Sequence, residues 1–189
     1  GAGAIQVRAW ACLNPLARMY GRPATMADYL ASPKYIEPYH LMDMAVTTDG
    51  AVAFVLTSIE RARDLAKPPV AVLGIGYGDA QGGQWWEGAA HYTRLPVAKA
   101  KEAAFGQAGI TVKDIDVAQF YDCFTAELIF QLEDYGWCAK GEGGAYVEAG
   151  HIGPGGDTPA NTSGGLLSAY HLADMTGLSE AVFQLRGEA

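Results

Sequence analysis

The stretch AQFYDCFTAE, residues 118–127, decides the fold because an apolar strand there turns directly into a helix. VKDIDVAQF, residues 112–120, reads as a turn that feeds a buried strand ending at Phe120. The following CFTAELIFQLEDYGW changes to helical spacing, with a stop near Gly136 and one apolar face formed by Phe124, Leu128, Ile129 and Leu132. Ligands of open α/β sheets gather where strands end and helices begin, so Tyr121-Asp122-Cys123 is a candidate site.

A second junction of the same kind is NTSGGLLSAYH, residues 161–171. Gly164 and Gly165 allow the backbone to come close to a ligand or to a neighbouring element. The residues after them predict a helix with Tyr170 and His171 side by side in its middle. Two proton-handling side chains at a helix entrance make this junction the second candidate.

The rest of the chain alternates helical and strand-like segments. Helical spacing covers residues 7–19, 25–32, 60–66 and 96–109, and Thr25 with Asp28 forms a capping box. AVAFVLTS (51–58) and VAVLGIGYG (70–78) read as strands that are apolar on both faces. This order predicts an α/β architecture with sheets covered on both faces.

Composition excludes several classes of protein. Half of the 189 residues are apolar, the net charge is −8, and the 13 basic residues are scattered, which argues against binding to nucleic acid. The apolar runs fall short of the roughly 20 residues of a membrane helix, and no signal segment opens the chain, so we expect a cytoplasmic protein. Cys12, Cys123 and Cys138 lack CxxC spacing, which predicts reduced thiols and no metal site. AVFQLRGEA at the end reads as helix without a cap, so we expect a piece of a longer protein.

From about Asp49 onward the sequence resembles the later part of a thiolase. TTDGAVAFVLTS is similar to the strand that closes the first half, and YTRLPVAKAKEAAFGQAG to a substrate-side loop and helix. Thiolases carry Asn-Glu-Ala-Phe, or His-Asp-Cys-Phe in the sterol-carrier branch, where this chain has Tyr121-Asp122-Cys123-Phe124. Their Asn-x-x-Gly-Gly and Gly-His-Pro are similar to Asn161, Gly164, Gly165 and Tyr170-His171-Leu172. The resemblance implies the thiolase fold, with residues 1–66 as the end of the first half and 67–189 as an incomplete second half.

The departures from the thiolase pattern both add a phenol. Tyr121 replaces an oxyanion-hole Asn or His, and Tyr170 replaces the Gly before the retained His171. This pairing is similar to the thiolase-like lipid-transfer-protein aldolases, in which a steroid acyl-CoA bearing a tertiary alcohol undergoes retro-aldol cleavage. The resemblance implies a steroid ketone and propionyl-CoA as products, no cofactor beyond the CoA thioester, an OB-fold partner protein and a homodimer.

Retro-aldol cleavage needs a base for the hydroxyl proton, donors for the thioester enolate and an acid for the carbon. We assign one role in proton transfer to each of Tyr121 and Tyr170, without choosing which is the base, and a tuning or oxyanion role to His171. An unperturbed phenol is a poor base, because ionising it at pH 7 costs roughly 4 kcal/mol. The residues expected to bind substrate are Asp122, Asn161, Gly164, Gly165 and Trp86. Capping is a sufficient explanation for Asp122, and close helix packing explains Gly164 and Gly165 equally well.

Two other functions remain open from the sequence. A sterol-carrier-type thiolase or acyltransferase would use a nucleophilic cysteine outside these residues together with His171. A lipid or acyl-CoA binding subunit would bind the same ligand without turnover. Trp85 and Trp86 fit either an apolar steroid pocket or packing against another subunit.

Overall fold

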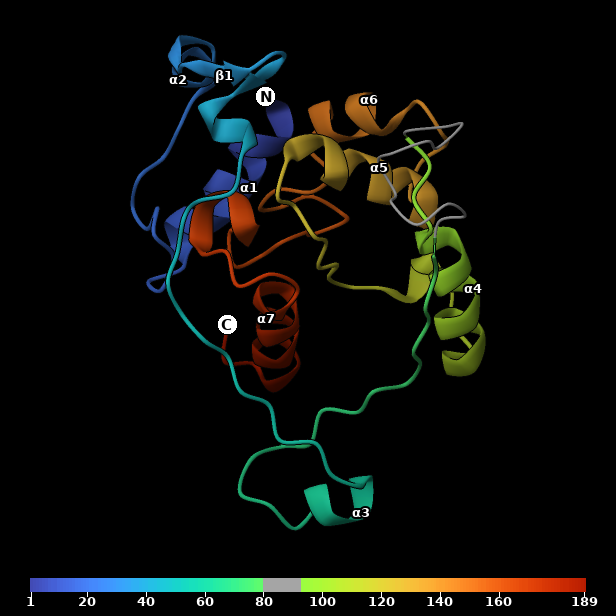
Figure 1. The fold of residues 1–189 in the computed structure, drawn as a ribbon. Coiled ribbons are helices and arrows are strands. Elements are labelled where there is room, and N and C mark those ends of the chain that lie inside the picture. The colour runs from blue at the N-terminus through green and yellow to red at the C-terminus, as the bar shows by residue number, and fades with distance from the viewer. Residues whose placement is uncertain (80–92) are drawn as a thin grey trace.

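The computed structural model describes residues 1–79 and 93–189, and it is rich in helix (Figure 1). Within these ranges the one sheet is the antiparallel pair of β1 (Lys34–Ile36) and β2 (Tyr39–His40). The α-helices are α1 (Ala2–Leu13), α2 (Met26–Ala31), α3 (Ile59–Ala62), α4 (Val97–Ala108), α5 (Thr125–Tyr135), α6 (Gly143–Glu148) and α7 (Met175–Arg186). Shorter turns are η1 (Leu41–Asp43), η2 (Val112–Asp114) and the π-helix η3 (Gly165–Ala169).

The core forms where α1 packs against α5, α6 and η3. Val7, Leu128 and Leu132 are fully buried there, and each contributes about 1.5 to 3 kcal/mol through the surface it removes from water. Gly164 lies so close to α1 that a Cβ would collide with Ala11. The small residues of α1 therefore allow the second junction to lie directly on the helix.

Glycine and capping signals located most helix ends. α4 ends at Ala108 with Gly109 in the left-handed conformation, and α5 ends at Tyr135 with Gly136 in the same conformation. The capping box of Thr25 and Asp28 is present at the start of α2. Those predictions are confirmed, whereas α1 spans residues 2–13 where helical spacing predicted 7–19.

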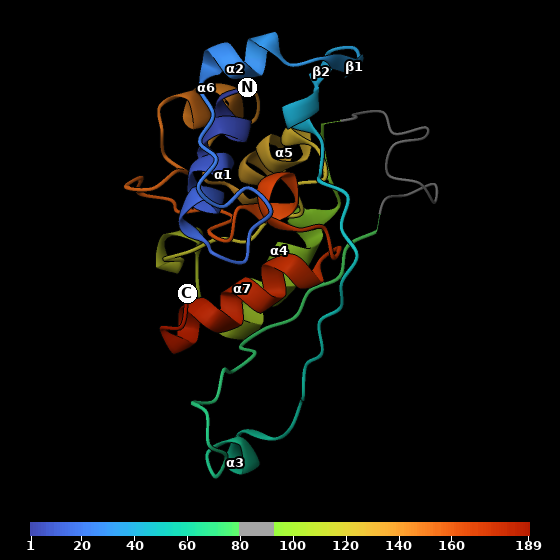
Figure 2. The ribbon, with the colours of Figure 1, turned by 90° about the vertical axis from the view of Figure 1, so that its left-hand side faces the viewer.

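The strands predicted at 51–58 and 70–78 are not found in the part of the chain that the structure describes. Both segments are extended and lead to and from α3, which stands apart from the helical body (Figures 1 and 2). An extended segment becomes a strand only if a neighbour accepts its backbone hydrogen bonds, and neither segment pairs with a described residue. Val55 and Leu56 are consequently 90% and 86% exposed.

The segment 70–78 packs against α4 instead of a sheet. Gly74, Gly76 and Gly78 alternate along it. A Cβ on Gly74 or Gly76 would collide with the backbone of α4, and a Cβ on Gly78 with the backbone of Pro96 just before this helix. Gln107 of α4 donates to the Ile75 carbonyl at 2.8 Å and accepts from the Ile75 N–H at 3.2 Å. The glycines thus serve close approach to a helix.

The helix predicted to contain Tyr170 and His171 is broken at these residues. η3 ends at Ala169, and Tyr170 is extended with φ −157° and ψ 148°. The Thr176 hydroxyl accepts from the Leu172 N–H and donates to the Tyr170 carbonyl, both at 3.0 Å, which holds the turn into α7. Helical spacing on both sides concealed this break, because side-chain hydrogen bonds rather than glycine or proline produce it.

The end of α7 also differs from the expectation of an uncapped helix. Gly187 is left-handed with φ 65° and caps α7 after Arg186. Among residues 1–79 and 93–189, no helix combines the length and the apolar character needed to span a bilayer.

Candidate active site

The two junctions identified in the sequence lie against each other. Residues 118 and 160 form a parallel bridge, which aligns the two extended segments that enter the junctions. The buried Asn161 side chain continues this pairing, because its amide accepts from the Phe120 N–H at 2.7 Å and donates to the Phe120 carbonyl at 3.1 Å. Asn161, predicted to bind substrate, therefore fixes the residue that precedes Tyr121.

The Asp122 side chain of the first junction contacts the backbone of the second junction. Its Oδ1 accepts from the Leu166 N–H at 2.7 Å, and its Oδ2 presses against Gly165, where any Cβ would overlap it. Gly164 and Gly165 both have positive φ, at 100° and 57°. Close packing, the structural alternative for the Gly-Gly step, is thus present, while a substrate-binding role for these residues stays a prediction.

The Asp122 carboxyl is fully buried, and its Oδ2 has no hydrogen-bond partner among the described residues. Burial raises the pKa of Asp122 to about 6, against the opposing effect of the Leu166 N–H. A carboxyl in this position retains its proton in mildly acidic solution.

Tyr121 and His171 meet across the two junctions. Their ring centroids are 6.2 Å apart, and the planes meet edge to face at 74°. Gln131 of α5 fixes the Tyr121 backbone, since its side chain donates to the Tyr121 carbonyl at 2.7 Å and accepts from the Tyr121 N–H at 3.3 Å. Burial and then the neighbouring Cys123 and Asp174 raise the pKa of the Tyr121 phenol, so this group is a proton donor at neutral pH.

Tyr170 lies apart from this pair. It is half-buried against Ala11, Ala17 and Ala169. Burial raises the pKa of this phenol too. The structure therefore brings together Tyr121 and His171, and it packs Tyr170 against the cluster of Ala11, Ala17 and Ala169.

A cavity of about 590 Å³ adjoins Tyr121. That volume lies within the range of pockets for ligands of drug size. Tyr121, Asp122, Asn161 and Gly165 line it, whereas Tyr170 and His171 do not. Further wall residues come from α7 and the segment before it, and they include Asp174, Thr176 and Leu178. Trp86 lies outside the described residues.

The segment 44–48 forms hydrogen bonds with both junctions. No pattern in the sequence indicated this arrangement. The Ala45 N–H donates to the Cys123 carbonyl and the Val46 N–H to the Leu166 carbonyl, each at 2.9 Å. The Thr48 hydroxyl accepts from the His171 N–H at 3.1 Å. This segment therefore sets the position of the His171 backbone relative to Cys123.

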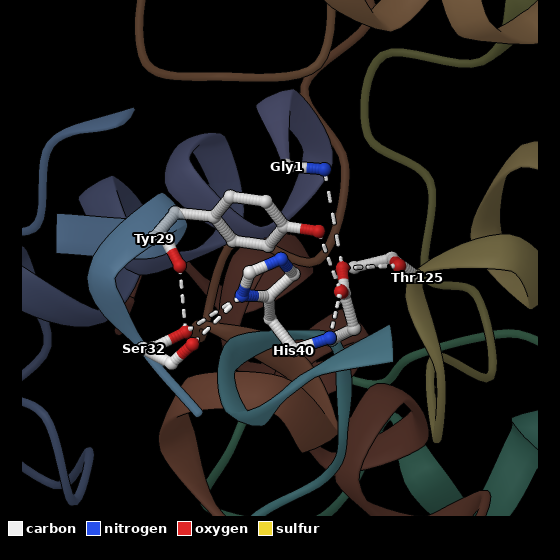
Figure 3. Close-up of polar contacts among 6 residues, drawn as sticks. Gly1, Tyr29, Ser32, His40 and Thr125 are labelled. Carbon is white, nitrogen blue, oxygen red and sulfur yellow. Dashed lines mark hydrogen bonds and ion pairs between the residues drawn. The ribbon is translucent and has the colours of Figure 1, made fainter. Parts of the chain in front are cut away.

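Asp43, just before that segment, is a second residue that the sequence analysis missed. Its carboxylate accepts from the Tyr29 hydroxyl at 2.6 Å, the Thr125 hydroxyl at 2.7 Å and the His40 N–H at 2.8 Å (Figure 3). The amino group of Gly1 is 3.9 Å from the same carboxylate. Because Thr125 is the first residue of α5, this cluster holds the helix start that follows Tyr121-Asp122-Cys123. No motif pointed to Asp43, since its donors come from segments far apart in the sequence.

Comparisons with known proteins agree with this fold. The family described as Thiolase C-terminal domain-like matches residues 80–189. A steroid side-chain-cleaving aldolase of Thermomonospora curvata is 36% identical over 99% of this chain and 49% of its own length. A 17-hydroxy-3-oxo-4-pregnene-20-carboxyl-CoA lyase of Mycobacterium tuberculosis is 38% identical over the same shares.

A solved structure named Ltp2-ChsH2(DUF35) aldolase superposes with a TM-score of 0.95 at 35% identity, covering 99% of this chain and 50% of that one. The expected thiolase fold is thereby confirmed. This chain spans about half the length of the curated relatives it matches.

Proposed function

The chain belongs to the thiolase C-terminal domain-like family, and on that basis we propose that the protein carrying it is a carbon–carbon lyase of steroid side-chain acyl-CoA thioesters. The reaction is a retro-aldol cleavage that yields a steroid ketone and propionyl-CoA. Support comes from relatives named as a steroid side-chain-cleaving aldolase and a carboxyl-CoA lyase, which match nearly the whole of this chain. The observation that carries the proposal is Tyr121, a phenol at the thiolase junction that faces His171 and lines the cavity.

The chemistry of Tyr121 suits such a reaction better than acyl transfer. Cleavage moves the electron pair of the broken bond onto a thioester enolate, which hydrogen-bond donors in a dry site stabilise by about 3 to 4 kcal/mol each. The half-buried phenol next to an imidazole supplies such a donor. No covalent nucleophile is needed, and Cys123, the cysteine nearest to this site, has a pKa raised by burial to about 11.

The remaining assignments rest on the family resemblance. We propose that Tyr170 takes part in the other proton transfer, that an OB-fold protein is the partner and that the protein acts as a cytoplasmic homodimer. The solved relative named for Ltp2 together with ChsH2(DUF35) supports the presence of a partner.

Replacement of single tyrosines in the protein that carries this chain tests the function. We expect Tyr121→Phe to lower kcat for cleavage by about 100- to 1000-fold, the usual effect of losing one such donor, with little change in acyl-CoA affinity. Tyr35→Phe, at a side chain that is 65% exposed on β1, is the matched control and should leave turnover unchanged.

Tyr170→Phe in the same assay tests the second phenol. A proton-transfer role predicts lost turnover with unchanged acyl-CoA binding, whereas a purely packing role predicts lower thermal stability and retained turnover. Full activity of Tyr121→Phe would refute the assignment of the site, and acyl transfer to free CoA without ketone formation would favour a thiolase.

A further inference from the structure

Three arginines lie beside the second junction without an acidic partner. Arg8 lies in α1, and Arg18 and Arg22 lie in the turn that follows this helix. The chain has a net charge of −8, yet residues 1–27 contain these three basic side chains and no Asp or Glu. In the part of the chain that the structure describes, none of the three forms an ion pair. We call these residues the arginine cluster.

Hydrogen bonds bring the two segments that carry the arginines to the end of η3. The Arg18 N–H donates to the Ala169 carbonyl at 3.0 Å, and the Arg8 Nε donates to the Ser168 hydroxyl at 2.9 Å. The Arg8 Nη1 also donates to the Arg22 carbonyl, at 3.5 Å. The cluster is therefore fixed by the backbone and side chains of the second junction rather than spread over a mobile surface.

The arginine cluster is also connected to the residues expected to handle protons. The Arg18 guanidinium donates to the Thr47 carbonyl, and the hydroxyl of the next residue, Thr48, accepts from the His171 N–H at 3.1 Å. Tyr170 packs against the small apolar group to which the same turn contributes. The positive charges thus lie on the side of the second junction that carries Tyr170 and His171.

Within the described residues, the arginine cluster donates only to uncharged oxygens. These belong to the Ser168 hydroxyl and to the carbonyls of Arg22 and Thr47. Each guanidinium has five N–H donors, so most of them remain available. Burial lowers the pKa of Arg8, and the neighbouring Arg22 acts in the same direction. Like charges held together, one of them half-buried, are unfavourable unless an anion compensates them, so this arrangement favours an anionic ligand.

The proposed substrate carries such an anion. The CoA part of an acyl-CoA has a 3′-phosphate and a diphosphate, and its pantetheine arm separates these groups from the reacting thioester. Phosphates accept paired N–H bonds from guanidinium groups. A protein with a net charge of −8 repels a polyanion at long range, so it needs a local region of positive charge to hold one.

We propose that Arg8, Arg18 and Arg22 bind the phosphate groups of the CoA part of the substrate. This inference rests on the proposed function and adds a binding site for the end of the substrate that does not react. None of the three arginines lines the cavity beside Tyr121, so the reacting end and the phosphate end are held at separate places.

A comparison of two substrates tests the inference. The CoA thioester and the pantetheine thioester of the same steroid acid share the reacting groups, but only the first carries phosphates. In the protein that carries this chain, Arg22→Gln should lower the ratio of kcat/KM for the CoA thioester to kcat/KM for the pantetheine thioester by about 10- to 100-fold, the usual effect of losing a hydrogen bond between charged groups. Arg22→Lys should retain most of this ratio, because the charge remains. Arg63→Gln, at an exposed position after α3, is the matched control and should leave the ratio unchanged.

A binding measurement separates this inference from the function. Calorimetric titration with adenosine 3′,5′-bisphosphate should give about 10- to 100-fold weaker binding to Arg18→Gln and to Arg22→Gln than to the wild type, with an affinity that falls as salt is added. No binding to the wild type, equal affinity in all three proteins, or the same loss with uncharged adenosine would overturn the inference, while cleavage by the wild type upholds the function. A wild type that binds the bisphosphate through these arginines but cleaves no steroid acyl-CoA would refute the function and uphold the phosphate site.

Discussion

Asp122 shows how a single buried carboxyl can hold two distant chain segments together. One oxygen accepts from the Leu166 N–H, and the other is enclosed against Gly165 without a partner. The sequence placed Asp122 at a junction by its motif and offered capping as an alternative. The structure gives a third role, because its hydrogen bond crosses from the start of α5 to η3.

The raised pKa of Asp122 makes the stability of the fold depend on pH. In the folded state this pKa is about 6, against 3.8 for an unperturbed group. The folded chain therefore binds more protons between these values, so the stability contribution is present at low pH and is lost as the pH rises through 4 to 6. The difference corresponds to about 3 kcal/mol.

Urea unfolding at pH 4 and pH 7 measures this effect. We expect the wild type to lose stability between the two values by about 3 kcal/mol more than Asp122→Asn, which keeps the acceptor for Leu166 but cannot ionise. Equal losses in the two proteins would show that Asp122 has an ordinary pKa in the folded state.

At the scale of elements, the contact of α1 with η3 determines how closely the second junction approaches α1. Gly164 has φ 100° and lies directly against Ala11, so only glycine fits there. We expect Gly164→Ala to destabilise the fold by about 2 to 5 kcal/mol, from backbone strain plus overpacking. Gly106, a helix-interior glycine of α4 with open space around it, provides the contrast, because Gly106→Ala should stabilise the fold by about 0.5 to 1 kcal/mol. Thermal or chemical unfolding of both variants checks the prediction, and a neutral Gly164→Ala would contradict it.

Local sequence patterns predicted the ends of helices well and the pairing of strands poorly. Gly109 and Gly136 ended helices where expected, because a helix stop depends on one residue and its conformation. The prediction of strands at 51–58 and 70–78 was wrong for the described structure, since strand formation depends on a neighbouring strand that local sequence does not specify. The break at Tyr170 was missed for a related reason, because Thr176 makes it from six residues away.

At the scale of the whole molecule, the site is assembled from segments distributed along the chain. Motifs identified Tyr121 and His171, and the structure places them together. Asp43 and Thr48 could not be found this way, because each acts through a partner distant in sequence rather than through a motif. Tyr170 does not line the cavity beside Tyr121, so its part in proton transfer stays a prediction.

The most direct test of the account is the product analysis of the protein that carries this chain, incubated with a steroid acyl-CoA bearing a tertiary β-hydroxyl, in D₂O and without free CoA. Retro-aldol cleavage predicts equal amounts of steroid ketone and propionyl-CoA, with one deuterium on the carbon next to the thioester. Product formation that requires added CoA, or an acyl group transferred without release of ketone, would contradict the account.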